Sequence, residues 1–165
     1  MSRSAILFVL MSAALALDVR VDVEAGDPFR KEATMTARGT FDVNVTPQPP
    51  GDPAGGPFTR LFLDKRFHGD LQGMSRGQML AAETAVTGSG GYVAFELVTG
   101  TLQGKRGTFI LQHKGTMRQE VYAMDITIVP DSGTGELAGI SGAMTILIKG
   151  SEHSYEFEYS LDDHD

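Results

Sequence analysis

Residues 143–161, AMTILIKGSEHSYEFEYSL, decide the fold of this chain. From position 153 onward the odd-numbered residues are His, Tyr, Phe, Tyr and Leu, and the even-numbered ones are Ser, Glu, Glu and Ser. This period of two is typical of a β-strand with one buried face. A two-residue turn at Gly150-Ser151 would place Tyr155 opposite Ile146, so that two apolar faces coincide. The stretch therefore predicts an antiparallel hairpin.

The same alternation recurs along the chain from residue 36 onward. The 20 glycines and 7 prolines lie mainly between the alternating segments, as expected of turns. The pattern predicts an all-β fold of about eight antiparallel strands, and closing them into an up-and-down barrel would leave no exposed sheet edge. The predicted strands are Thr36–Val45, Thr59–Leu71, Ser75–Val86, Tyr92–Leu102, Thr108–Met117, Val121–Val129, Ala143–Lys149 and His153–Leu161.

Two connections are longer than tight turns. Residues 47–57, PQPPGDPAGGP, form a Pro/Gly loop that cannot lie inside a strand. Residues 130–142, PDSGTGELAGISG, are expected to hold one helical turn around Glu136–Ala138.

Short turns determine which face of each strand points inward, because an antiparallel hairpin ties the inward face of one strand to that of the next. A turn at residues 118–119 places the face that carries His113 inside. A turn at residues 105–106 then places the even-numbered face of residues 92–102 inside, and this face includes Glu96.

The face of the segment 75–86 is ambiguous. An even-length turn after this segment would put Met79 and Glu83 inside, whereas an odd-length turn would put the even-numbered face inside. The even-numbered face is the more apolar one and is predicted to point inward: Leu80, Ala82, Thr84 and Val86.

Three ionisable residues are predicted to share the barrel interior. Lys65 lies on the apolar face of residues 59–71, and Glu96 and His113 lie on the two inward faces described above. Glu96 is diagonal to His113 on the neighbouring strand, about 7 Å away, which long side chains can span. Burying such charges is costly unless they pair, so their presence on apolar faces needs an explanation.

Two interpretations of this cluster remain open. In the first, Lys65, Glu96 and His113 line a pocket for a small hydrophobic molecule. An isomerase or cyclase reaction there would use Glu96 or His113 to transfer a proton and Lys65 to stabilise developing negative charge. The pocket wall would consist of inward aromatic and aliphatic side chains, with tyrosine hydroxyls as orienting donors: Phe67, Tyr92, Phe109, Leu111, Tyr155, Phe157 and Tyr159.

In the second interpretation the protein is a non-enzymatic structural or interaction module with a solidly packed lumen. A Lys65–Glu96 ion pair, with His113 hydrogen-bonded beside it, would fill the interior and fix the strand register. An eight-stranded barrel is just wide enough to be filled by side chains or to hold one small ligand, so strand number does not decide between the two.

Composition narrows the range of partners. A net charge of −7, with scattered Lys and Arg, disfavours nucleic acid and anionic membranes, and no apolar run is long enough for a spanning helix. The chain has no cysteine, and His68 and Asp70 share a predicted outward face without a third ligand. Neither a metal nor a cofactor is therefore predicted. The identity of the ligand and the oligomeric state, including a homo-oligomer, are left open.

The N-terminus has the composition of a targeting segment. Residues 1–17, MSRSAILFVLMSAALAL, contain one arginine, then an apolar stretch, and Ala14-Leu15-Ala16 as a cleavage site of the A-x-A form. This predicts a signal peptide and a secreted or periplasmic protein. The alternative is a translation start at Met35 and a cytoplasmic protein. The remaining segments are predicted to be a linker at 18–34, a single barrel domain at 35–162 and a tail at 163–165.

Four stretches resemble a bacterial family of small proteins of unknown function. They follow one another in the order and spacing of that family and cover nearly everything after Met35. They read LDKRFHGDLQGMSRGQML (63–80), GSGGYVAFELVTGTLQGKRGTFILQHKGTM (88–117), VPDSGTGELAGISG (129–142) and HSYEFEYSL (153–161).

The resemblance implies an allene-oxide-cyclase-like barrel, a calycin-like fold of eight strands that plant dirigent proteins share. Allene oxide cyclases confine a reactive epoxide in an apolar barrel, and dirigent proteins steer the coupling of phenolic radicals. Both use shape more than acid–base groups, and none of their functional residues can be matched to this sequence. What the resemblance implies for function is an apolar small molecule in the lumen. Members of the family usually begin near the equivalent of Met35, and the N-terminal extension departs from that pattern.

Overall fold

The computed structural model describes residues 33–49, 58–119 and 121–162. The predictions for residues 1–17 and 18–34, for the tail and for most of the Pro/Gly loop therefore lie outside the described residues. Among the residues that are described, no helix is long and apolar enough to cross a membrane. The strands are β1 (Met35–Pro47), β2 (Phe58–Gly69), β3 (Leu71–Glu83), β4 (Gly90–Leu102), β5 (Lys105–Arg118), β6 (Val121–Ile128), β7 (Thr134–Gly135), β8 (Ile140–Lys149) and β9 (Glu152–Leu161).

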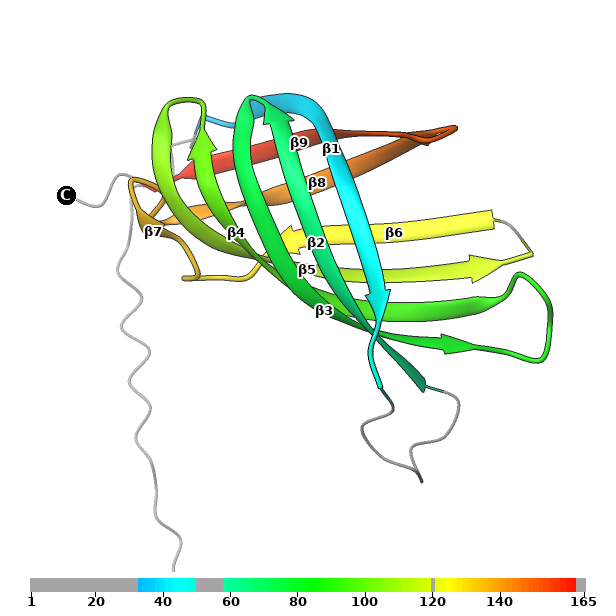
Figure 1. Ribbon diagram of the computed structural model, residues 1–165. Helices are drawn as coiled ribbons and strands as arrows, with labels where there is room; N and C mark the ends of the chain where they lie inside the picture. The colour runs from blue at the N-terminus through cyan, green and yellow to red at the C-terminus, as the bar shows by residue number, and fades with distance from the viewer. Residues whose placement is uncertain (1–32, 50–57, 120, 163–165) are drawn as a thin grey trace, which may run out of the picture. The chain divides into compact units, whose positions relative to one another are not determined.

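Eight of these strands close into an antiparallel barrel with up-and-down order (Figure 1). Each long strand pairs with the next one along the chain. β6 pairs with β8, and β9 pairs back with β1, while the two-residue β7 pairs with the start of β5. The predicted all-β fold is confirmed, and the predicted strands match the observed ones to within a few residues.

One end of the barrel, called here the closed end, is where β3, β5 and β8 begin. Its interior is solid, because aromatic rings stack across it at centroid distances of 5.7 Å for Phe109 and Phe157 and 5.3 Å for Phe157 and Tyr159. Leu137 contributes a further buried side chain from the connection between β6 and β8. The opposite end, where β6 begins and β8 ends, is called the open end.

One of the three predicted hairpin registers is confirmed, and in the other two only the predicted inward faces are. The β8–β9 hairpin has the predicted register, with Tyr155 opposite Ile146. The predicted positions of two other turns were wrong by one or two residues. The β4–β5 turn is at Gln103-Gly104, and the β5–β6 turn follows Arg118, which pairs with Val121. Both shifts leave an even-length turn, so the predicted inward faces of β4 and β5 are correct.

The predicted inward face of β3 was wrong. Glu83 pairs with Gly90, so the loop of residues 84–89 has even length, and Met79 lies opposite the buried Ala94. The inward face is therefore the odd-numbered one, while Leu80 is exposed. The prediction failed because the inward positions 73, 75 and 77 carry small residues, Gly, Ser and Gly, and this face scores low on apolarity. Small residues there leave room for larger side chains from the neighbouring strands.

The connection at residues 130–142 contains successive turns where a helical turn was expected. The amides of Leu137, Ala138 and Ile140 each donate to the carbonyl three residues earlier, and no helix is formed around Glu136–Ala138. The Glu136 carboxylate also accepts a hydrogen bond from the Arg106 amide at 2.9 Å. These bonds hold the connection against the closed end of the barrel.

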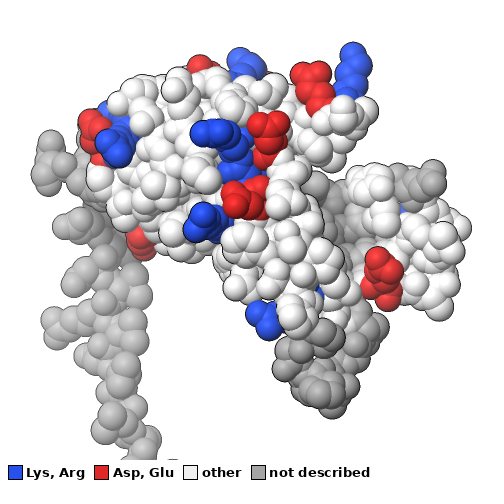
Figure 2. Space-filling view, in the orientation of Figure 1, with Lys and Arg blue, Asp and Glu red and all other residues white. Residues whose placement is uncertain are grey.

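Charges of both signs lie side by side on the outer face of the barrel. Figure 2 shows Lys and Arg side chains beside Asp and Glu side chains, with uncharged surface between them. Arg38 and Glu156 form one such pair at 2.8 Å.

Candidate functional site

Four adjacent strands bring one polar side chain each into the barrel interior: Lys65 from β2, Ser75 from β3, Glu96 from β4 and His113 from β5. Lys65 pairs directly with Ser75, and His113 is opposite Ala94, two residues before Glu96. The three predicted ionisable residues therefore share one face of the lumen, as the hairpin argument required. They and Ser75 are called here the polar cluster.

Glu96 is the centre of the polar cluster. Lys65 Nζ lies 2.6 Å from Glu96 Oε1, and Ser75 Oγ donates a hydrogen bond of 2.6 Å to Oε2. His113 Nε2 lies 3.1 Å from Oε1. The angles at this last contact are unsuitable for a hydrogen bond, so Nε2 is a buried nitrogen without a hydrogen-bond partner among the described residues.

The polar cluster is almost fully removed from solvent. Glu96 is 0% exposed, His113 3% and Lys65 6%. Lys65 also stands 5.1 Å above the centre of the Phe41 ring, which adds a cation–π contact. Charges buried to this degree are tolerated only when they are paired and hydrogen-bonded, and the Lys65–Glu96–Ser75 contacts meet that condition.

His113 is held in its neutral form. The pKa of the imidazole is lowered to about 4, mainly by burial; the Glu96 carboxylate opposes this shift and the Lys65 ammonium adds to it. At neutral pH the cluster therefore consists of one ion pair, a hydroxyl and an uncharged imidazole. Such a set can hold or transfer a proton near apolar walls.

The three predicted tyrosines have different roles. Tyr92 is half-buried, and burial, together with the Glu96 carboxylate, raises the pKa of its hydroxyl. The Tyr155 hydroxyl accepts a hydrogen bond from the Leu71 amide at 2.9 Å. The Tyr159 hydroxyl donates to Gln103 Oε1 at 2.8 Å. Tyr155 and Tyr159 thus tie strands and turns together, and Tyr92 is the one whose hydroxyl has no such bond among the described contacts.

The other predicted wall residues lie in the packed core. Phe67, Phe109, Leu111 and Phe157 are all buried, and the last three are fully buried. Phe67 contacts Phe41 and Tyr155 through ring pairs at 5.5 and 5.7 Å. Contact between these four residues and a ligand stays a prediction.

A cleft of about 680 Å³ opens between β6 and β8 at the open end. It is lined mainly by inward-facing apolar side chains of the two strands. Ile126, at its inner side, is the strand partner of His113, so the cleft reaches the level of the polar cluster. The lining residues are Tyr122, Met124, Asp125, Ile126, Ala143, Met144, Thr145, Ile146 and Ile148.

Sequence reasoning missed both the cleft and Ser75. The alternation of side chains along β6 and β8 does place Ile126 and Met144 inside, but it gives no sign that the two strands separate. Ser75 was excluded with the wrong face of β3. The available signal was the position of Ser75 between Gly73 and Gly77 on one strand face, because serine combines a small side chain with a hydrogen-bonding group.

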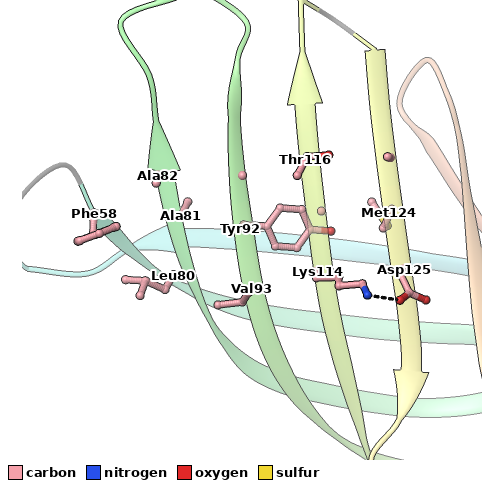
Figure 3. Close-up of a pocket in the computed structure, with 13 residues that line it drawn as sticks. Phe58, Leu80, Ala81, Ala82, Tyr92, Val93, Lys114, Thr116, Met124 and Asp125 are labelled. Carbon is pink, nitrogen blue, oxygen red and sulfur yellow. Dashed lines mark ion pairs between the residues drawn. The ribbon is translucent and has the colours of Figure 1, made fainter.

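A second hollow, of about 500 Å³, crosses β2 to β6, shares Met124 and Asp125 with the first cleft and is shown in Figure 3. Its apolar lining includes Leu80 and Val93, whose side chains belong to outward faces and are exposed. Lys114 of β5 and Asp125 of β6 form an ion pair of 3.0 Å beside it (Figure 3). We consider the β6–β8 cleft the better site, because its lining is continuous with the lumen and the polar cluster.

No metal centre is formed by the part of the chain that the structure describes, since no three His, Cys, Asp or Glu side chains there lie close enough to hold an ion. His68 pairs with Asp42 at 3.0 Å on the outer surface. Asp70 instead accepts a hydrogen bond from the Arg38 amide.

Comparison with known proteins identifies a family and a similar solved structure. Residues 37–159 match the family described as "Protein of unknown function (DUF3224)". The chain is similar to the crystal structure of a protein with unknown function from the DUF3224 family of Shewanella oneidensis MR-1. The two share 42% sequence identity and a TM-score of 0.74 over 79% of this chain and 98% of that chain. Curated proteins give no match.

Proposed function

Because this chain belongs to the DUF3224 family, whose description gives no activity, we propose its function from the site: the barrel binds a small hydrophobic molecule in the β6–β8 cleft. The cleft itself carries the proposal, since inward apolar side chains of both strands line an opening of about 680 Å³. Volumes of roughly 300–1,000 Å³ with mostly apolar walls are typical of small-molecule sites.

The chemistry of the lining favours an uncharged ligand. Asp125 is the one charged residue of the lining, and Lys114 already pairs with it. Lys65 of the polar cluster is paired with Glu96. None of the residues that line the cleft is a cation that could bind a carboxylate or phosphate group, so apolar contact supplies the binding energy.

An isomerase or cyclase reaction is the finer form of the proposal. A ligand that displaced the Ile126 side chain would meet neutral His113 and the Lys65–Glu96 pair. Glu96 or His113 would then transfer the proton, and Lys65 would stabilise developing negative charge, while the apolar wall confines the conformers of the substrate. The resemblance to allene oxide cyclases supports confinement as the main catalytic device.

The second candidate is a non-enzymatic structural or interaction module. The contacts of Glu96 favour this candidate, because both oxygens of its carboxylate already have partners. On this view the polar cluster fixes the strand register, and the cleft holds only water.

Binding of a neutral dye separates the two candidates. Nile red, an uncharged apolar probe, is titrated against the parent protein and two variants. Met124→Glu places a charge in the cleft, where Met124 is 44% exposed. Val93→Glu is the matched control, since Val93 is 54% exposed but lies on an outward face beside the second hollow.

We expect Met124→Glu to weaken dye binding about tenfold or more, because an ionised carboxylate must then be desolvated, and Val93→Glu to leave it unchanged. Weaker binding in Val93→Glu, with or without an effect of Met124→Glu, would place the dye in the second hollow, because Met124 lines both hollows and Val93 only the second. Absence of dye binding to the parent would favour the structural module. Native mass spectrometry of protein purified from its own host would then identify any retained ligand by its mass.

A further inference from the structure

The seam between β6 and β8 is the weakest join of the barrel. A single residue pair, Thr127 with Ala143, links these strands. Every other neighbouring pair of the eight long strands shares at least six residue pairs, the shortest being β1 with β9. Beyond Thr127 and Ala143, the β5–β6 and β8–β9 hairpins diverge toward the open end (Figure 1).

The two separated edges are complementary in sequence. Continuing the register of Thr127 and Ala143 toward the open end would bring Ile126 opposite Met144 and Met124 opposite Ile146. Tyr122 would then come opposite Ile148. Each of these pairs is apolar and faces the lumen, and none contains a proline that would prevent ladder hydrogen bonds.

The separated edges are also unusually apolar for free strand edges. Tyr122 is 72% exposed and Ile148 is 62% exposed, and the outward Leu147 is exposed as well. Free edges in native proteins are normally protected by charges, prolines or bulges. Over this stretch each edge carries only one charge, Asp125 on β6 and Lys149 on β8.

We propose that the β6–β8 seam is a gate that closes over an empty cleft: β6 and β8 pair further in the register of Thr127 and Ala143, here called zipping. This inference rests on the proposed function, because the gate has a role only if the cleft binds a ligand. Zipping adds up to six residue pairs and covers the exposed apolar side chains that face the lumen. The residues that line the cleft belong to β6 and β8 alone, so a bound molecule lies between the two strands and favours the open state.

A pivot exists beside the single pair. Gly142, directly before Ala143, has φ of +150°, a backbone conformation that favours glycine. A Cβ atom there would meet Tyr159 Cα at 2.8 Å, so β8 lies close against β9 at this point. The base of β8 is therefore held, and the far end of β8 can approach β6 only together with β9, with which it is paired as far as Lys149 and Glu152.

Disulfide trapping tests the gate, and the chain has no cysteine of its own to interfere. The variant Ala123→Cys/Leu147→Cys places thiols on two outward positions that become opposite when the seam zips. Directly opposite residues have Cα atoms about 4.5–5.5 Å apart, which suits a disulfide. Ala123→Cys/Thr145→Cys is the control, because its second thiol is two residues out of register. Both variants are oxidised with copper phenanthroline, with and without Nile red, and the products are followed by non-reducing electrophoresis.

We expect the in-register pair to cross-link within one chain at least about tenfold faster than the control, and more slowly with dye. After cross-linking, the dye should no longer bind, and reduction of the disulfide should restore its binding. Equal cross-linking rates in the two variants, with normal dye binding, would overturn the gate and leave the cleft as a binding site. Faster cross-linking of the in-register pair, in a protein that binds no dye, would overturn the proposed function and with it the role of zipping as a gate.

Discussion

Glu96 is the residue on which most of the interior polar contacts converge, and its charge has a clear energetic consequence. Changing Glu96 to Gln keeps the shape of the side chain but leaves the Lys65 ammonium buried without a counter-ion. Breaking a buried ion pair from one side costs about 3–5 kcal/mol. We therefore expect a loss of this order in the unfolding free energy of Glu96→Gln, measured by urea denaturation at pH 7.

The double variant Lys65→Met/Glu96→Leu is the control for that loss. Removing both charges avoids the unpaired ion, and a buried ion pair replaced by apolar side chains is often neutral or stabilising. The double variant should therefore be more stable than Glu96→Gln. If Glu96→Gln unfolds at the same urea concentration as the parent, the ion pair contributes nothing to stability.

His113 makes stability depend on pH. Its folded pKa of about 4 is below the value of 6.5 for an exposed histidine, so the unfolded chain binds a proton more readily between these values. The stabilisation that neutral His113 provides is fully present above pH 6.5 and is lost as pH falls toward 4. Between pH 7 and pH 5 this amounts to roughly 2 kcal/mol of unfolding free energy.

Urea denaturation of the parent and of His113→Gln at pH 7 and pH 5 measures that contribution. The variant should lose less stability than the parent over this interval, whatever its absolute stability. His68→Gln is the control, because His68 lies on the outer surface beside Asp42. Equal pH dependence in the parent and His113→Gln would mean that the folded imidazole titrates normally.

The alternation of side chains along the strands was sufficient to predict which ionisable residues meet inside the barrel. Lys65 could be placed because its strand alternates strongly, and Glu96 and His113 because short turns fix their faces. Alternation does not determine side-chain rotamers. The distances among the three residues, and the missing hydrogen bond at His113 Nε2, depend on those rotamers. Ser75 could not be recognised until the face of β3 was known.

At the scale of the strands, β3 shows why apolarity alone chooses a wrong face. Gly77 lies opposite Glu96, and a Cβ atom at Gly77 would come within 2.5 Å of Glu96 Cγ. The inward face of β3 therefore has to be small at this position. Apolarity favoured the even-numbered face, which carries Leu80 and Val86, although the small residues of the odd-numbered face accommodate a neighbouring side chain.

Gly77→Ala tests this explanation. The added methyl group would press on Glu96 and on the Phe95 carbonyl, and overpacking of this kind costs about 1–3 kcal/mol. Gly91→Ala is the control, because its Cβ would lie 3.3 Å from the Gly115 carbonyl oxygen, which is a milder contact. Thermal unfolding should show a larger decrease in Tm for Gly77→Ala. A Tm at or above that of Gly91→Ala would mean that β3 has room for a larger residue at position 77.

The inward faces of the hairpin strands were predictable, but two of the registers and the seam were not. Tight turns tie the registers of β4, β5 and β6 to one another, so an error of two residues in a turn leaves every side chain on the correct face. The connection at residues 130–142 is long enough to leave the register of β6 against β8 undetermined. The opening of the seam, and with it the cleft, is a property of the folded barrel that local sequence does not encode.

At the scale of the whole barrel, the closed end and the open end differ in packing and exposure. The closed end is packed with aromatic rings and covered by the connection that carries Leu137. The open end exposes apolar side chains along the β6–β8 cleft. Substitutions at the two ends should therefore affect different properties of the protein.

Leu137→Ala and Met124→Glu separate stability from binding. Leu137 is fully buried at the closed end, and truncating a buried leucine to alanine costs about 2–5 kcal/mol of unfolding free energy. Because the polar cluster lies between Leu137 and the cleft, Nile red affinity of the folded variant should stay at the parent value. Met124→Glu should show the opposite pattern, with near-parent stability and weak dye binding. Urea denaturation measures the stability of both variants, and dye titration measures their affinity for Nile red. A decrease of both stability and affinity in Leu137→Ala would mean that the two ends of the lumen are coupled through the core.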